Sequence, residues 1–259
     1  MKDTKGFTLI EIMVAMAIFA IVVTGIYQTY HFQQRSYMKQ EKVVDMQQNL
    51  RAGLYFLKRD IRMAGYDPTE DADATITIAN IAELKFEFDE NGDGDMDNNT
   101  NLTDSGEIIR LALTDDDNKN GIADWIDSGS NPRSNPCRLG REYITLVGVT
   151  EKKGGLQPVS ENVDALEFCY ILADGTETTS PSDPDDIRSI IVSMLARTEN
   201  PIKGHTDDKT YTQASNDTNL TPNLSTRPPV WGPFNDSYQR RLLVTKLRCR
   251  NMGMNPYAD

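Results

Sequence analysis

Two acidic loops share the pattern D-x-[DN]-x-[DN]-G-x-x-D, which is typical of calcium-binding loops. In such a loop, side-chain oxygens at positions 1, 3, 5 and 9 and the backbone carbonyl at position 7 bind the ion, and the glycine at position 6 makes the turn. The candidate ligands of loop 1, residues 89–100, are Asp89, Asn91, Asp93, Asp95 and Asp97. Those of loop 2, residues 116–127, are Asp116, Asn118, Asn120, Ile122 and Asp124. The sequence therefore predicts two calcium sites.

The two loops differ at position 12, which usually carries a bidentate glutamate. Loop 2 has Asp127 there, a shorter carboxylate, whereas loop 1 has Thr100, which brings no negative charge. We therefore expect loop 2 to be the tighter site. The alternative is that both loops are solvated turns, which Asp and Asn form readily without a metal ion.

A long apolar segment, the foot (residues 7–30), has no proline and a single charged side chain, Glu11. As a helix, residues 7–27 would be about 30 Å long, which is the thickness of the apolar core of a bilayer. Lys2 and Lys5 precede the foot in a short leader, residues 1–6, so the N-terminus is expected to stay in the cytoplasm while the rest crosses the membrane. No A-x-A cleavage site follows the foot. We therefore expect an uncleaved membrane-spanning helix.

Glu11 is out of place in this apolar segment. An unpaired carboxylate in lipid costs at least ~2.5 kcal/mol. Either the side chain reaches the lipid headgroups, or it has a positively charged partner.

Charge is unevenly distributed along the chain. The 259 residues include 27 basic and 39 acidic side chains, a formal charge of −12. Residues 31–63 carry +4, whereas residues 64–259 carry −16. An acidic surface repels phosphate groups, so no nucleic-acid partner is expected.

Common catalytic motifs are missing from the sequence. It contains only two histidines, His31 and His205, and no G-x-S-x-G, P-loop, H-E-x-x-H or G-x-G-x-x-G motif. These absences argue against most simple hydrolases, kinases and dehydrogenases. We therefore expect a protein that is not an enzyme.

The stem, residues 31–65, continues the foot as an amphipathic helix. Its apolar residues recur at spacings of three and four and are Val43, Met46, Leu50, Leu54, Leu57, Ile61 and Ala64. Gly65 and Pro68 should end the helix. The sequence predicts one helix from Phe7 to Met63, whose stem packs on the rest of the molecule rather than forming a free coiled coil, because the stripe spans only about three heptads.

The remaining residues, 66–259, form the head, which is rich in predicted strands separated by polar loops. The predicted strands are residues 74–78, 83–88, 107–113, 142–149, 165–172, 187–196 and 242–249. Residues 198–229, rich in Thr, Asn, Asp and Pro, should be a loop excursion or a disordered segment. The fold class expected is α+β, with one antiparallel sheet packed on the stem.

The chain has three cysteines, Cys137, Cys169 and Cys249, without C-x-x-C spacing, which excludes a zinc ribbon or a thioredoxin-like site. An exported head meets an oxidising environment, and Cys169 and Cys249 both lie in predicted strands, so a disulfide between them is one interpretation. The other is that all three are small buried apolar residues.

The stretch from Lys5 through Gly6, Phe7 and Thr8 to Glu11 resembles the class III signal of type IV prepilins and type II secretion pseudopilins. This resemblance implies cleavage by prepilin peptidase between Gly6 and Phe7 and N-methylation of Phe7. It also implies a partner for Glu11, namely the Phe7 amine of a neighbouring subunit. The implied fold is the pilin lollipop, a long N-terminal helix with a β-sheet head.

Several segments of the head, and the junction between stem and head, resemble those of the PilW-like minor pilins. These are residues 51–66, 161–168, 174–175, 187–198, 240–245 and 247–251, whereas residues 198–229 match nothing in that family. The resemblance implies a minor pilin that joins other minor and major pilins on an inner-membrane assembly platform and primes or caps a type IV pilus. Its head would lie in the periplasm before assembly and on the pilus or cell surface afterwards.

Two other functions stay open. The J-type pseudopilin at the tip of a type II secretion pseudopilus has the same foot chemistry. A calcium-dependent adhesin at the filament tip would use the excursion at residues 198–229 to bind its target.

Overall fold

The computed structural model describes residues 6–96, 106–128, 137–147, 150–224 and 227–253 of the chain. It divides into two compact units, Met1–Val44 and Asp45–Asp259. The first helix, α1 (Leu9–Ile61), contributes residues to both units. The foot therefore belongs to the first unit and the whole head to the second.

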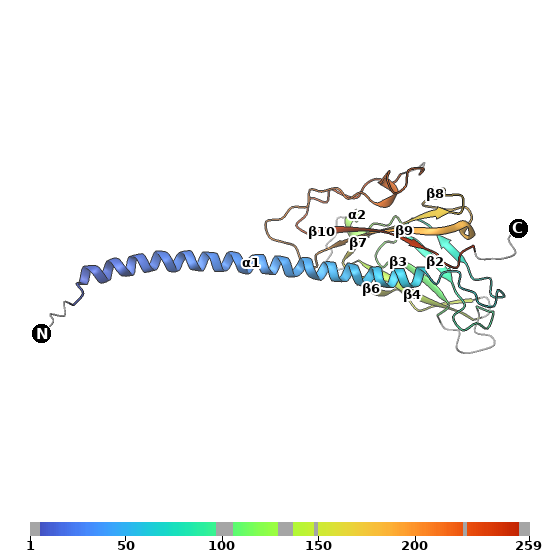
Figure 1. Ribbon diagram of the computed structural model, residues 1–259, viewed down its shortest axis with the longest axis horizontal. Coiled ribbons are helices and arrows are strands. Elements are labelled where there is room, and N and C mark those ends of the chain that lie inside the picture. Colours follow the sequence, from blue (N-terminus) through green and yellow to red (C-terminus); the bar gives the residue numbers. More distant parts are fainter. Residues whose placement is uncertain (1–5, 97–105, 129–136, 148–149, 225–226, 254–259) are drawn as a thin grey trace. The chain divides into compact units, whose positions relative to one another are not determined.

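Helix α1 is 53 residues long and unbroken, as its lack of proline allows (Figure 1). It is slightly shorter than the predicted helix from Phe7 to Met63. After Ile61 the backbone tightens into a turn, because the N–H of Met63 donates to the carbonyl of Asp60 at 2.9 Å. Gly65, with a φ of 71°, then takes the left-handed conformation that the predicted helix stop requires.

In the first unit, every residue from Gly6 to Tyr30 is exposed. By length and composition, α1 could cross a membrane. A segment with so many exposed apolar side chains needs an apolar surrounding. The apolar helix and its exposure therefore agree with a membrane-anchoring foot.

The head contains two antiparallel sheets. The first follows the order β1-β2-β3-β4-β5, with β6 also paired to β4, and consists of β1 (Ile76–Ala79), β2 (Glu83–Glu87), β3 (Ile108–Leu113), β4 (Arg138–Val147), β5 (Thr150–Lys153) and β6 (Gln157–Glu161). The second has the order β10-β9-β7-β8 and consists of β7 (Val163–Leu172), β8 (Glu177–Thr178), β9 (Ile187–Arg197) and β10 (Arg240–Arg248). The short helices are α2 (Asp124–Ser128), η1 (Pro184–Asp186) and η2 (Ala214–Asn216).

The α+β class and the antiparallel head are confirmed, but the prediction of a single sheet was wrong. The chain changes sheets within one residue, between β6 and β7, at Asn162. Asn162 has a φ of 56°, a left-handed conformation that Asn tolerates better than most residues. Its carbonyl accepts the N–H of Arg197 at 2.9 Å, which fixes the bend against β9.

The stem packs through the predicted apolar stripe. Met46, Leu50, Leu57, Ile61 and Ala64 are buried, and Val43 and Leu54 are half-buried. At Gly53 the helix meets both sheets, since a Cβ there would lie 2.8 Å from the Cβ of Ser160 in β6 and 3.3 Å from the methyl of Met194 in β9. The glycine is required by this close approach.

A buried ionic network lies where β7, β9 and β10 run side by side (Figure 1). The carboxylate of Asp164 accepts from Nε of Arg197 at 3.0 Å and from Nε of Arg240 at 2.7 Å. Arg240 also pairs with Asp207 at 2.9 Å and with Asp236 at 2.6 Å. Burial raises the pKa of Asp164 to about 6, and the two arginines oppose that rise.

The connection between β9 and β10, residues 198–239, is held against the second sheet. Besides Asp207 and Asp236, it places Ser215 against the buried carboxylate of Glu167, which accepts the Ser215 N–H at 3.2 Å and its hydroxyl. The N–H of Ala214 donates to the Ser193 hydroxyl at 2.8 Å. Residues 198–229 are thus an excursion, as expected, and the alternative of a disordered segment was wrong for their described part.

All three cysteines are buried and free, so the proposed Cys169–Cys249 disulfide was wrong. Strand β9 separates the two residues, because Cys169 in β7 pairs with Ile191 and β10 lies on the other side of β9. Strands two places apart in a sheet are about 9–10 Å apart, beyond the usual Cα separation of a disulfide. Burial raises the pKa of each thiol to about 12.

We predict that Arg240→Met destabilises the full-length protein strongly. It removes the ion pairs of Arg240 with Asp164, Asp207 and Asp236, and breaking a buried ion pair costs about 3–5 kcal/mol. The matched control is Arg241→Met, one residue along β10 and exposed, which should change the free energy of unfolding by less than about 0.5 kcal/mol. Chemical denaturation followed by tryptophan fluorescence measures both. Equal effects of the two substitutions would contradict the assigned role of the network.

Candidate functional site

The start of α1 places Glu11 in a capping box. The carboxylate of Glu11 accepts both the N–H and the hydroxyl of Thr8 at 2.8 Å. Thr8 directly precedes the first helical residue, Leu9, and Glu11 lies three residues after Thr8. This is the spacing of the reciprocal S/T-x-x-E cap. Gly6 and Phe7 lie just before this cap, and Phe7 is 87% exposed. The carboxylate therefore lies beside the backbone next to the predicted cleavage point.

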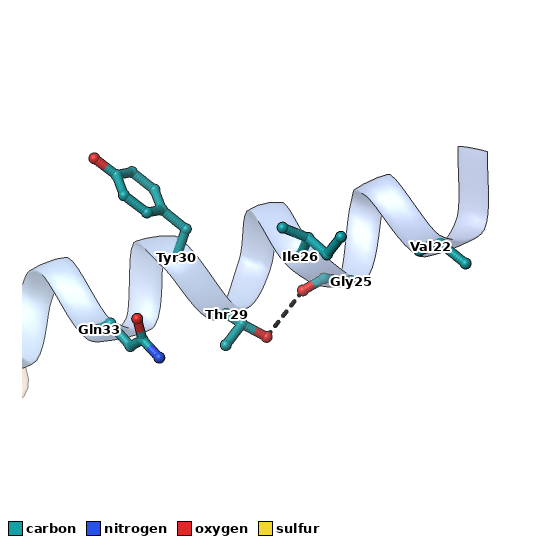
Figure 2. A pocket seen from close by; sticks show the side chains of 6 residues that line it. All are labelled: Val22, Gly25, Ile26, Thr29, Tyr30 and Gln33. Carbon is teal, nitrogen blue, oxygen red and sulfur yellow. Dashed lines mark hydrogen bonds between the residues drawn. The ribbon is translucent and has the colours of Figure 1, made fainter. Parts of the chain in front are cut away.

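The foot has a shallow depression at Gly25, which Figure 2 shows with its surrounding side chains. Val22, Ile26, Tyr30 and Gln33 surround the glycine, and nothing lies within 4 Å of where its Cβ would be. The Thr29 hydroxyl donates to the Gly25 carbonyl at 2.9 Å, so this polar side chain is satisfied by its own helix. The surface of the foot is therefore apolar in character even at Thr29.

The backbone of loop 2 is held by hydrogen bonds to its own side chains. Asp116 accepts the N–H groups of Asn120 at 3.0 Å and Gly121 at 2.9 Å. The amide groups of Asn118 and Asn120 donate to Oδ2 of Asp127 at 3.0 and 2.8 Å. Positions 3, 5 and 12 of the predicted calcium pattern thus converge, and Gly121 at position 6 takes the expected left-handed turn with a φ of 83°.

The remaining candidate ligands of loop 2 also lie in the turn. Oδ2 of Asp124 accepts the N–H of Asp117 at 2.9 Å, and Oδ1 of Asn120 accepts the N–H of Ile122 at 2.7 Å. Burial raises the pKa of Asp116, although the N–H groups of Gly121 and Asn120 oppose that rise. A cation bound here would stabilise the charged form of this carboxylate.

Loop 1 repeats the same turn in its described part. Asp89 accepts the N–H groups of Gly92 at 2.6 Å and Gly94 at 3.2 Å. Asn91 accepts the N–H of Asp93 at 2.7 Å, and Asp93 that of Asp95 at 3.2 Å. The other predicted positions, Asp97 and Thr100, lie outside the described residues, as do residues 1–5 of the leader.

The two loops leave opposite ends of the antiparallel β2–β3 pair, in which Glu83 pairs with Ala112 and Glu87 with Ile108. Within the described ranges, no three His, Cys, Asp or Glu side chains gather closely enough to form a metal site by themselves. A calcium ion in either loop would therefore also need the asparagine oxygens and the backbone carbonyl at position 7. The candidate ligand atoms in loop 2 are carboxylate, amide and carbonyl oxygens, which are the ligands that calcium prefers.

A cavity of about 530 Å³ lies between loop 2 and the β9–β10 connection. One wall is residues 228–234, which include Trp231 and Phe234, and the other walls include Ile122 and Ile126. Gln213 also lines it and donates to the carbonyl of Pro229 at 2.8 Å, while its buried Oε1 has no hydrogen-bond partner in the described part of the chain. The cavity is mostly apolar, with acceptor groups at its edge.

The comparison with protein families agrees with this geometry at the N-terminus. Residues 1–27 match the prokaryotic N-terminal methylation motif. A methylation signal at residues 1–27 thus covers the start of a long helix, which is followed by a head of antiparallel sheets. Among solved structures, it is similar to a type IV-like pilin from Thermus thermophilus, with 17% sequence identity, a TM-score of 0.44, and coverage of 79% of this chain and 96% of that one. A search of the curated proteins finds no match.

The matched motif includes Gly6, Phe7 and Glu11, the residues predicted for processing and assembly. Sequence analysis missed the capping role of Glu11, although the Thr8-x-x-Glu11 spacing carries that signal. It also missed Asp60, which is 2% exposed within the stem and pairs with Arg141 of β4. Asp60 lies beside Leu57 and Ile61 of the apolar stripe, and a charged side chain buried at such a position needs a partner of opposite charge.

Proposed function

We propose that this chain is a PilW-like minor pilin. Prepilin peptidase would cleave it after Gly6, Phe7 would be N-methylated, and the foot would anchor it in the inner membrane with the head in the periplasm. It would then join other minor and major pilins on the assembly platform to prime or cap a type IV pilus. The role is structural rather than catalytic.

The observation that carries this proposal is the methylation motif at residues 1–27, placed at the start of a 53-residue helix whose first half is exposed and apolar. Residues 6–30 are all exposed in the described part of this unit, so the foot needs lipid or the feet of other subunits around it. Glu11 gives this association a specific contact, because an amine at Phe7 of a neighbouring subunit would neutralise the carboxylate.

A J-type pseudopilin is the closest alternative, because it would use the same foot and the same processing. The two functions are separated by a deletion strain. Loss of twitching supports the minor pilin, and loss of exoprotein secretion supports the pseudopilin.

A ligand-binding tip adhesin is favoured by one observation, the cavity between loop 2 and residues 228–234. Its Trp231 and Phe234 could contact an apolar ligand, and Gln213 could accept a hydrogen bond from it. Deletion of the excursion that abolished adhesion but spared piliation would support this function over the first.

We also propose that loops 1 and 2 bind calcium, with loop 2 the tighter site. Supporting this, Asp127 lies at the amides of Asn118 and Asn120, so three candidate ligands are already close together, and an ion would take the place of the hydrogen bonds between them. Asp115 adds negative charge, and its pKa is raised by burial and by the nearby carboxylates of Asp124 and Asp117. Calcium would relieve the repulsion between these carboxylates. Extracellular calcium-binding modules work with dissociation constants of ~10⁻⁴ to 10⁻³ M, so even a weak site would be occupied.

The first prediction is that the mature chain begins at N-methylated Phe7. Mass spectrometry of the membrane-extracted protein measures this, and a chain beginning at Met1 or after residue 20 would contradict the proposal. In Gly6→Val the leader should be retained. A Cβ at Gly6 meets nothing within 4 Å, so failure of cleavage in this variant would not come from a clash within the fold.

For Glu11, we expect Glu11→Ala to leave membrane insertion intact and to impair assembly. The apolar foot still satisfies the bilayer, but the partner of the Phe7 amine is lost. Co-purification with other pilins and counts of pili measure the effect. The control is Thr8→Val, which removes the capping hydroxyl and keeps the carboxylate. If the two variants assemble equally poorly, Glu11 acts as a helix cap and the proposed pairing is wrong.

Millimolar calcium should raise the melting temperature of the protein, because an ion bound only by the folded state stabilises it. Asp116→Ala should remove more of this rise than Asp89→Ala, and Asp117→Ala, an exposed acid outside the ligand pattern, should remove little. Calorimetry and thermal melts with and without a chelator test this. The absence of both a binding heat and a melting shift would mean that the loops are solvated turns.

A further inference from the structure

Few large apolar side chains are exposed in the second unit. In the described part of Asp45–Asp259 they are Tyr55, Tyr66, Tyr143, Leu220 and Val230. Tyr55, on the stem, is 66% exposed, and Tyr143, on β4, is 47% exposed. Both belong to one group of contacting side chains around Arg59.

Direct contacts connect this group from end to end. The guanidinium of Arg141 lies 3.8 Å from the ring centre of Tyr143 and binds Asp60. Asp60 accepts from Nε of Arg59 at 3.0 Å, and the guanidinium of Arg59 lies 5.3 Å from the ring centre of Phe56. Tyr55 packs edge-on against Phe56 and lies one helical turn before Arg59. We call Tyr55, Phe56, Arg59 and Tyr143 the Arg59 patch.

The patch is held in place from beneath. Asp60 is almost fully buried, and the side chain of Arg141 is 10% exposed, whereas that of Arg59 is 49% exposed. The hydrogen bond to Asp60 raises the pKa of Arg59, and the nearby phenol groups of Tyr143 and Tyr55 add to this effect. An arginine fixed in this way loses little side-chain freedom when it binds a partner.

The composition of the patch is that of a protein-binding surface. Tyrosine and arginine are enriched among the residues that dominate binding energy at interfaces. The patch is also basic on an acidic protein, because it contains the half-exposed Arg59, whereas residues 64–259 carry −16. Lys58 and Arg51 are exposed on the same stretch of helix. The complementary surface is an acidic one, and the head of a second copy of this chain provides it.

We propose that the Arg59 patch is a docking surface for the acidic head of a second copy of this chain. This inference deepens the proposed function, since it adds a contact between subunits outside the foot. Charge attraction between the patch and the partner's carboxylates would orient the two copies, and Tyr55 and Tyr143 would supply the apolar contact.

The test measures self-association of the full chain in detergent micelles by analytical ultracentrifugation. Arg59→Gln and Tyr55→Ala should each raise the dissociation constant by about tenfold, the effect of losing one important interface residue. The matched controls, Arg241→Gln and Leu220→Ala, are exposed elsewhere on the second unit and should change it less than about twofold. Raising the salt concentration should weaken the wild-type association.

A Glu11→Ala arm separates this inference from the proposed function. If Glu11→Ala weakens association and both patch variants leave it unchanged, the docking surface is overturned while the role of the foot stands. If the patch variants weaken association and Glu11→Ala does not, the docking surface stands and the role of Glu11 falls. Thermal melts show that each variant is folded before its dissociation constant is compared with that of the wild type. If Arg59→Gln does not fold, Tyr55→Ala still tests the patch. Wild-type protein that stays monomeric at low salt also overturns the inference.

Discussion

The head depends above all on the carboxylate of Asp164. Its two oxygens bind Arg197 and Arg240, and these three residues belong to the three adjacent strands β7, β9 and β10. The backbone carbonyl of Asp164 accepts the N–H of Ala123 at 2.9 Å, which connects loop 2 to the same residue. A buried charge is tolerated only when it is fully paired, so the position of every element in this network is closely constrained.

Loop 2 inherits its shape from this arrangement. Gly121 lies so close to β7 that a Cβ there would be 2.3 Å from the carbonyl oxygen of Leu166, and its own carbonyl accepts the N–H of Leu166 at 2.8 Å. The backbone of the loop is therefore fixed by the sheet before any ion binds. A metal ion would then have to order side chains rather than backbone, namely those of Asp116, Asn118, Asn120, Asp124 and Asp127, which lowers the entropy cost of binding.

The predictable part of the molecule was the part with strong periodicity or a local motif. The stem stripe placed Met46, Leu50, Leu57 and Ile61 in the core correctly, and the apolar runs located β2, β3, β7 and β9 to within a few residues. Strand β5 was missed because all four of its residues are polar and exposed, so no alternation marks it. β6 was missed for a similar reason, since Ser160 is its one buried residue and it contains Pro158.

The second sheet and the ordered β9–β10 connection could not be read from the sequence, because both depend on long-range pairing. Asp207 and Asp236 look like ordinary loop acids until Arg240 is brought to them across the fold. The loop turns were local and therefore predictable, as the hydrogen bonds of Asp89 and Asp116 to their own glycines show. Whether a site then holds an ion depends on side chains that sequence spacing only brings near one another.

The three free, buried thiols have a consequence for how the head reaches its native state. No covalent link has to form between Cys137, Cys169 and Cys249, so folding requires no oxidant and no disulfide isomerase. Folding of the head then depends on strand pairing, including that of β7 with β9, which do not follow one another along the chain. The head can consequently fold equally well in a reducing compartment, such as the cytoplasm of an expression host, and on the oxidising side of a membrane.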